Sequence, residues 1–150
     1  MENLADTSDG IRLRKGEEWP THDDVVNVVA SRKLSYPNKT HPEWKTETNP
    51  DQEKNFYVQS RNGDKLYPDV VVHDTKAALM IGEVETESTV NDESAEQWSD
   101  YSGLVSDFYL YVPEGTEDDA AQLLQSNRIA CSGLRAYSVV NGNVTFRDVS

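Results

Sequence analysis

Residues 67–72 read YPDVVV and residues 79–86 read LMIGEVET, two strongly apolar runs that between them contain three carboxylates. Both runs are apolar at odd and even positions alike, which is typical of central strands covered on both faces. A carboxylate buried in such a strand without a partner costs much free energy. Asp69, Glu83 and Glu85 therefore predict a site in which their charge is compensated.

A divalent cation is one such compensation, because hard carboxylate oxygens bind Mg²⁺ or Mn²⁺ and a bound metal activates water. Glu83 and Glu85 are two residues apart. In a strand they project from the same face, whereas the side chain of Val84 points away. The two glutamates are therefore expected to share one site.

The pairing register of the two runs decides whether Asp69 joins that site. If residues 66–73 and 77–86 form a hairpin, an even register sets Asp69 opposite Ile81 and diagonal to Glu83, about 7–8 Å away. A shared metal could bridge that separation. An odd register would put Asp69 on the opposite face.

The length of 150 residues indicates one domain with a proper core. Residues 17–150 are expected to form this domain, and residues 1–16 a flexible tail. The single cysteine excludes an internal disulfide, and no secretory or membrane-spanning apolar run is visible. We therefore expect a cytoplasmic protein that does not enter a membrane.

The formal net charge of -13 argues against a nucleic-acid ligand, because phosphate binding relies on Lys and Arg. The charge is unevenly distributed, however. Residues 1–65 hold 10 of the 14 basic residues, whereas residues 66–150 hold 15 of the 27 acids. A polyanion is expected to approach the N-terminal part. The acidic excess is interpreted as a solvating surface, such as one suited to high salt.

The N-terminal part is predicted to form a helix, a long loop and a three-stranded meander. Thr21 and Asp24 resemble a capping box, and valines at helical spacing follow. His22 falls in the first turn, where the neighbouring acids suit the helix dipole, an interpretation preferred to a metal role. Asn62-Gly63 predicts a hairpin turn that sets Tyr67 opposite Val58. The predicted ranges are helix 21–33, loop 34–54 and strands 55–60, 65–73 and 77–86.

The C-terminal part is predicted to contain two helices and three strands. A helix between two strands is a crossover, so residues 107–112 should run parallel to residues 77–86. Thr116 and Asp119 suggest a second capping box. The predicted ranges are helix 91–102, strand 107–112, helix 116–126, strand 134–140 and a last strand through 146, after an Asn141-Gly142 turn.

This order of elements, with acids on the second and third strands, resembles the core of the PD-(D/E)xK nuclease superfamily. Pro68-Asp69 matches its first motif, and Glu83-Val84-Glu85 matches its second except at the last position. Gln97 and Tyr101 match the QxxxY helix of RecB-like members, and a spacing of four puts both on one helical face. The resemblance implies an α/β, restriction-endonuclease-like three-layer fold, with an antiparallel meander and a parallel crossover strand in one mixed sheet between helices.

The resemblance also implies a function and roles for these residues. Asp69 and Glu83 would bind Mg²⁺ or Mn²⁺, with the Val84 carbonyl as a further candidate ligand. Gln97 and Tyr101 would orient the site or contact the nucleic-acid backbone. The expected activity is that of a metal-dependent nuclease acting on DNA, and a homodimer would suit cleavage of both strands.

Glu85 departs from the family pattern, which has Lys at this position in most members. A lysine stabilises developing negative charge, and a carboxylate cannot donate in its place. Glu85 could hold a second metal or act as general base, because neighbouring acids raise its proton affinity. It could equally mark lost activity. The alternatives are therefore an inactive module of the same fold that binds a protein or nucleic acid, and an accessory subunit completed by a partner.

Overall fold

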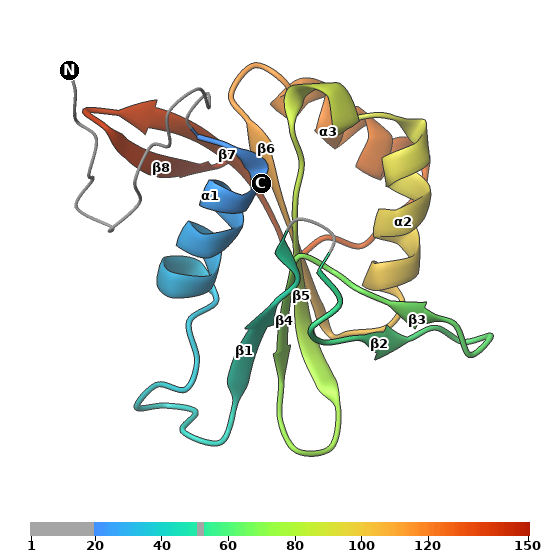
Figure 1. Cartoon of the computed structure of the whole chain (residues 1–150). Coiled ribbons are helices and arrows are strands. Elements are labelled where there is room, and N and C mark those ends of the chain that lie inside the picture. Colours follow the sequence, from blue (N-terminus) through green and yellow to red (C-terminus); the bar gives the residue numbers. More distant parts are fainter. Residues whose placement is uncertain (1–19, 51–52) are drawn as a thin grey trace.

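A computed structural model describes residues 20–50 and 53–150. A six-stranded mixed sheet in the order β1-β4-β5-β6-β7-β8 forms its framework, and β2 and β3 form a separate two-stranded sheet (Figure 1). The predicted tail at residues 1–16 lies outside the described residues. The strands are β1 Lys45–Thr48, β2 Val58–Gln59, β3 Lys65–Leu66, β4 Val70–His73, β5 Ala78–Val84, β6 Asp107–Pro113, β7 Gly133–Val140 and β8 Asn143–Asp148.

The helices lie close to their predicted positions. They are α1 His22–Val28, continued by the π-helical turn η1 Val29–Lys33, then the short 3₁₀ turn η3 Glu87–Thr89, α2 Asp92–Ser102 and α3 Glu117–Ser126. The first capping box is confirmed: Asp24 N donates to Thr21 Oγ1 at 3.2 Å, and Thr21 N donates to the Asp24 carboxylate at 2.8 Å. None of the described helices is long and apolar enough to span a bilayer.

The first strand of the antiparallel meander is β1, so the prediction of residues 55–60 for this position is wrong. β1 pairs with β4, with Thr46 opposite Val72 and Thr48 opposite Val70. Its sequence, KTET, lies at the edge of the sheet and buries little apolar surface, so its composition gave no strand signal and it fell in the predicted loop.

Residues 58–59 and 65–66 instead form the β2–β3 ladder. Val58 lies opposite Leu66, and Gln59 lies opposite Lys65. This register brings Tyr67 to Tyr57 rather than to Val58, and the two tyrosine rings meet edge to face at 6.3 Å between centroids. The hairpin was therefore predicted correctly, but its register and its place in the main sheet were not.

Strands β4 and β5 are antiparallel with an even register, but the register differs by two residues from the expected one. Val71, not Asp69, lies opposite Ile81, and Val70 lies opposite Gly82. The same register places Asp69 directly across from Glu83. A turn closed by Asp74 N donating to Ala77 O, together with a β-bulge at Val72 and His73, produces the shift.

The crossover prediction is confirmed, because β5 and β6 are parallel, with Glu83 opposite Leu110. A second crossover through α3 makes β7 parallel to β6, and β7 turns through Asn141-Gly142 into antiparallel β8. The second capping box is not formed. Thr116 Oγ1 donates to Pro113 O at 2.7 Å and no side chain caps the helix, because the backbone of Thr116 is not in the extended conformation of a capping residue.

The sheet is covered by helices on both faces, with α1 on one side and α2 and α3 on the other (Figure 1). The valines of α1 pack with Val70, Val72, Val84 and Tyr111 in one buried cluster. The opposite cluster joins Val71, Ile81 and Leu110 to Trp98 and Tyr101 of α2 and to Ala120 and Leu124 of α3. The α/β class with a mixed sheet is therefore as predicted.

Candidate functional site

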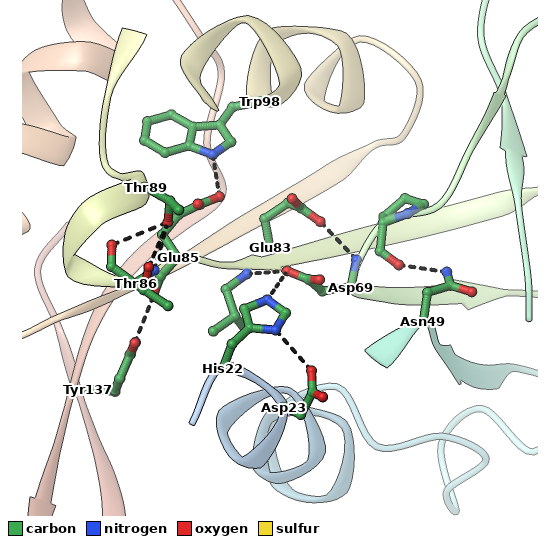
Figure 2. A network of polar contacts seen from close by, with 12 residues as sticks. His22, Asp23, Asn49, Asp69, Glu83, Glu85, Thr86, Thr89, Trp98 and Tyr137 are labelled. Atoms are coloured by element: carbon green, nitrogen blue, oxygen red, sulfur yellow. Dashed lines mark hydrogen bonds and ion pairs between the residues drawn. The ribbon is translucent and has the colours of Figure 1, made fainter. Parts of the chain in front are cut away.

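Asp69 and Glu83 meet where β4 begins and β5 ends, and Figure 2 shows them at the centre of a network of polar contacts. Asp69 N donates to Glu83 Oε2 at 2.8 Å, and Val84 N donates to Asp69 Oδ2 at 2.9 Å. Each carboxylate therefore holds the backbone of the neighbouring strand. The two acids are in contact because they lie directly across from each other on neighbouring strands. In the expected register they would have been diagonal, with a metal ion bridging the distance between them.

Glu83 is a buried carboxylate that lies near two further acids. The Glu83 residue is only 5% exposed to solvent. Burial, followed by the negative charges of Asp69 and Glu85, raises the pKa of Glu83 well above its ordinary range, and the hydrogen bond from Asp69 N opposes this only in part. In the absence of a cation, the site therefore favours a protonated Glu83.

Glu85 lies on the same side of the sheet as Glu83 and contacts helix α2. Trp98 Nε1 donates to Glu85 Oε2 at 2.8 Å, and the hydroxyl of Tyr137 donates to Glu85 O at 2.7 Å (Figure 2). Burial raises the pKa of Glu85, while hydrogen bonds from Trp98 and Thr89 lower it. Glu85 is thus a fixed, partly satisfied carboxylate rather than a mobile surface acid.

The backbone of Val84 faces Asp69. Glu85 N donates to Tyr111 O, so the backbone groups of Glu85 point toward β6. Successive residues of a strand point their backbone groups to opposite edges, so those of Val84 point to the other edge of β5, where Val84 N donates to Asp69 Oδ2. The N–H and C=O of one strand residue point to the same edge. The Val84 carbonyl is therefore directed toward β4, the side on which Asp69 lies.

Gln97 and Tyr101 lie on α2 as the QxxxY spacing requires. Tyr101 is buried, whereas Gln97 is exposed, and a side-chain hydrogen bond joins them. Burial raises the pKa of Tyr101, and the negative charges of Glu83 and Asp69 raise it further. Tyr101 packs in the buried cluster between the sheet and helices α2 and α3, and its hydrogen bond to Gln97 connects it to the exposed side of α2.

His22 also belongs to the site. From the sequence, its place in the first turn of the helix was interpreted through the helix dipole, in preference to a metal role. Its Nε2 lies 3.2 Å from Asp69 Oδ2, and its Nδ1 lies 3.0 Å from Asp23 Oδ1. The hydrogen bond with Asp69 raises the pKa of His22 to about 9, although burial opposes the shift. No pattern in the sequence links His22 to Asp69, because 47 positions separate them.

Asn49 is a second residue that the sequence analysis missed. It is 3% exposed, and its amide Nδ2 donates to Pro68 O and to Phe56 O, each at 2.7 Å. Its Oδ1 accepts from the backbone N of Asn55 and Phe56. Asn49 thereby ties the loop before Asp69 to the end of β1. The Asn-Pro pair at residues 49–50 was the available signal, since it favours turns.

Carboxylate oxygens are ligands that a hard divalent cation prefers, but in this structure the carboxylates are arranged for hydrogen bonding. Within residues 20–50 and 53–150, no three His, Cys, Asp or Glu side chains gather in a geometry that could hold a metal ion. Oε1 of Glu83 nevertheless accepts no hydrogen bond from these residues, although Glu83 is buried. A buried carboxylate oxygen without a donor, beside two further acids, is chemically fitted to a cation.

No protein-family model, curated protein sequence or solved structure matches this chain. The function is therefore inferred from the residues of the site.

Proposed function

We propose that this protein is a metal-dependent phosphodiesterase that cleaves nucleic acid, with DNA as the expected substrate. The observation that supports this most directly is the buried carboxylate of Glu83, whose pKa is raised by burial and by two neighbouring acids and whose Oε1 has no donor among the described residues. A divalent cation would remove the repulsion that these three acids create.

We also propose the restriction-endonuclease-like arrangement for the fold. A helix, three antiparallel strands, a crossover helix and a parallel strand occur in this order as α1, β1, β4, β5, α2 and β6, with the β2–β3 hairpin inserted between β1 and β4. Acids lie at the start of the second strand and the end of the third. The finer assignment is supported by this coincidence of topology and acid position.

The metal would be held by Asp69, Glu83 and the carbonyl of Val84, with Glu85 as a further ligand. The positive charge of Mg²⁺ or Mn²⁺ would stabilise the negative charge that develops on the phosphate, and the ion would lower the pKa of the attacking water. The imidazole of His22 adds a nitrogen donor next to Asp69. These side chains come from α1, β4 and β5, so the fold brings distant residues to one point.

The protein's own groups would hold the substrate and move the proton. Glu85 is buried with a raised pKa, which suits a carboxylate that accepts a proton from water near neutral pH. Trp98 fixes its position through the indole N–H. Gln97, which is exposed, would contact the phosphate backbone from α2, and buried Tyr101 would orient it through their hydrogen bond.

The test is calorimetric titration of Mn²⁺ into the wild type and Asp69→Asn, at moderate and at high salt. We expect saturable binding by the wild type and at least about tenfold weaker binding by the variant, because even partners of metal ligands contribute about 10–100-fold. Asp92→Asn, in the first turn of α2, is the matched control. Equal binding by wild type and Asp69→Asn would contradict the proposal.

A second candidate is a non-catalytic module of the same fold that binds a protein or nucleic acid, alone or completed by a partner subunit. The bond from Trp98 to Glu85 favours it, because it stabilises a carboxylate where a cationic side chain would serve catalysis. Among the described residues, no lysine contacts Asp69, Glu83 or Glu85 in a hydrogen bond or ion pair.

Glu85→Lys separates the two candidates. A working glutamate predicts that Glu85→Lys lowers cleavage by about 100-fold or more, because the general base is lost. A decayed site predicts the reverse, a gain of cleavage in a variant of an inactive parent. Cleavage of a labelled oligonucleotide in Mn²⁺ is the measurement, and circular dichroism checks that the variant is folded.

A further inference from the structure

The β2–β3 hairpin carries two tyrosines, each with a lysine above its ring. Lys65 Nζ lies 4.8 Å from the centroid of Tyr57, and Lys54 Nζ lies 5.6 Å from the centroid of Tyr67. The two tyrosine rings are themselves neighbours, at 6.3 Å between centroids. Tyr57 is 47% exposed, one of the few large apolar side chains so open to solvent in the described part of the chain.

The aromatic pair reaches the Asp69 pocket through Tyr67, whereas Tyr57 borders a neighbouring pocket. Tyr67 and Lys54 line a pocket of about 580 Å³ together with His22, Asn49 and Asp69. The hairpin projects from the sheet beside α2 (Figure 1). A ligand that rests on Tyr57 and Tyr67 would therefore continue into the pocket where Asp69 lies.

The local charge also differs from that of the chain as a whole. Residues 53–67 hold three basic and two acidic side chains in a chain of net charge -13. Asp23 and Glu53 also line the pocket, and Asp23 is paired with His22. The hairpin is thus a surface that a polyanion can approach, next to a site that otherwise repels it.

We propose that the tyrosine pair Tyr57 and Tyr67, with Lys54 and Lys65, is a binding platform for single-stranded nucleic acid. This inference rests on the proposed function and names its substrate. Aromatic rings that alternate with cations bind single strands, because bases stack on the rings while the cations contact phosphates. A base stacked within a duplex cannot offer its face to a protein ring. An exposed cation–π contact is weaker than a base stack, so a base can displace the lysine from the ring.

The experiment measures binding separately from cleavage. A fluorescein-labelled oligothymidylate of about 20 nucleotides, longer than the site of one single-strand-binding module, is titrated in Ca²⁺ and in EDTA, and anisotropy is recorded over a range of salt. A blunt duplex of the same length is the competitor. The variants are Tyr57→Ala, Tyr57→Phe and Lys65→Gln. Lys33→Gln is the matched control, because Lys33 also lies over an aromatic ring, that of Phe146 in β8, which packs against the opposite core cluster.

We expect the single strand to bind more tightly than the duplex, and Tyr57→Ala to raise Kd by about 5- to 150-fold, the loss of one base stack. Tyr57→Phe keeps its ring and should bind like the wild type. Lys65→Gln should reduce the slope of log K against log salt by about 0.7, whereas Lys33→Gln leaves it unchanged. Tyr57 is exposed, so its replacement is not expected to unfold the protein.

Three results would overturn the platform: no binding of the single strand, equal or tighter binding of the duplex, or wild-type affinity in Tyr57→Ala. Cleavage in Mn²⁺ is scored on the same samples. If the wild type cleaves while Tyr57→Ala binds normally, the platform is wrong and the nuclease proposal stands. If Tyr57→Ala loses binding while no sample cleaves, the platform stands and the nuclease proposal falls.

Discussion

Replacement of Glu83 by glutamine is expected to abolish cleavage and, in the metal-free protein, to raise the free energy of unfolding at alkaline pH. Glutamine keeps an oxygen that can accept from Asp69 N but removes the buried charge. We propose Glu83 as a metal ligand, so cleavage should fall by more than about 100-fold, because a direct ligand contributes at least as much as the partners of ligands do. Opposite effects on activity and stability are the mark of a functional rather than a structural carboxylate.

The pH dependence of this effect has a definite sign. The pKa of Glu83 is raised in the folded protein, so between the ordinary glutamate pKa of about 4.3 and the folded value the native state binds more protons than the unfolded state. Stability of the metal-free wild type should therefore fall as pH rises through that window. Glu83→Gln lacks this dependence, so its advantage should grow with pH and vanish near pH 4.

Urea denaturation in EDTA at acidic and alkaline pH measures the effect, with Glu96→Gln on the exposed face of α2 as the control. Added Mn²⁺ should stabilise the wild type and leave Glu83→Gln unchanged, because a ligand stabilises only the state that binds it. A variant that is less stable than the wild type at alkaline pH in EDTA would contradict the assignment of strain to Glu83.

Replacement of Trp98 by alanine is expected to lower the free energy of unfolding by about 3–5 kcal/mol. Trp98 is fully buried in the cluster between α2, α3 and the sheet. Alanine would leave a cavity in that cluster and also remove the N–H donor of Glu85. Urea denaturation followed by far-ultraviolet circular dichroism measures the loss.

Trp98→Phe separates the packing from the hydrogen bond. Phenylalanine fills most of the space but leaves Glu85 without the indole donor, at a cost of about 1–3 kcal/mol when Glu85 is ionised. The pKa of Glu85 should rise further, because the hydrogen bond from Trp98 lowers it. The loss should therefore be larger at alkaline than at acidic pH. Trp44→Phe, in the other cluster, is the control, and a pH-independent loss in Trp98→Phe would contradict the role of the bond.

Several elements were predictable because local patterns determine them. The capping box at Thr21 and Asp24, the amphipathic spacing of α2 and the Asn141-Gly142 turn are each encoded within a few residues. The parallel pairing of β5 and β6 followed from the crossover between them. β1 was not predictable in this way, because a short edge strand of polar residues carries no periodic signal.

The residues of the candidate site also differ in whether a local sequence pattern predicts them. Asp69, Glu83 and Glu85 stood out because a carboxylate within an apolar strand is locally anomalous. His22 and Asn49 did not, because their roles depend on contacts with Asp69 and Pro68 across 47 and 19 positions of the chain. The neighbours of Glu85 were also hidden, since Trp98 reads as a core residue of an amphipathic helix until its N–H is seen to meet the carboxylate.

The sequence by itself determined the α/β class, the main helices, the crossover and the three acids, because periodicity, caps and turns act over short distances. The tertiary structure alone decided that β1 completes the meander and that Asp69 lies across from Glu83. It also decided that His22 and Trp98 reach the acids and that Asn49 holds the backbone before Asp69. The register depends on the turn closed by Asp74 and Ala77 and on the bulge at Val72 and His73, and a shift in register changes every cross-strand partner. Long-range contacts of this kind are decided by the packing of the whole sheet, which no local pattern records.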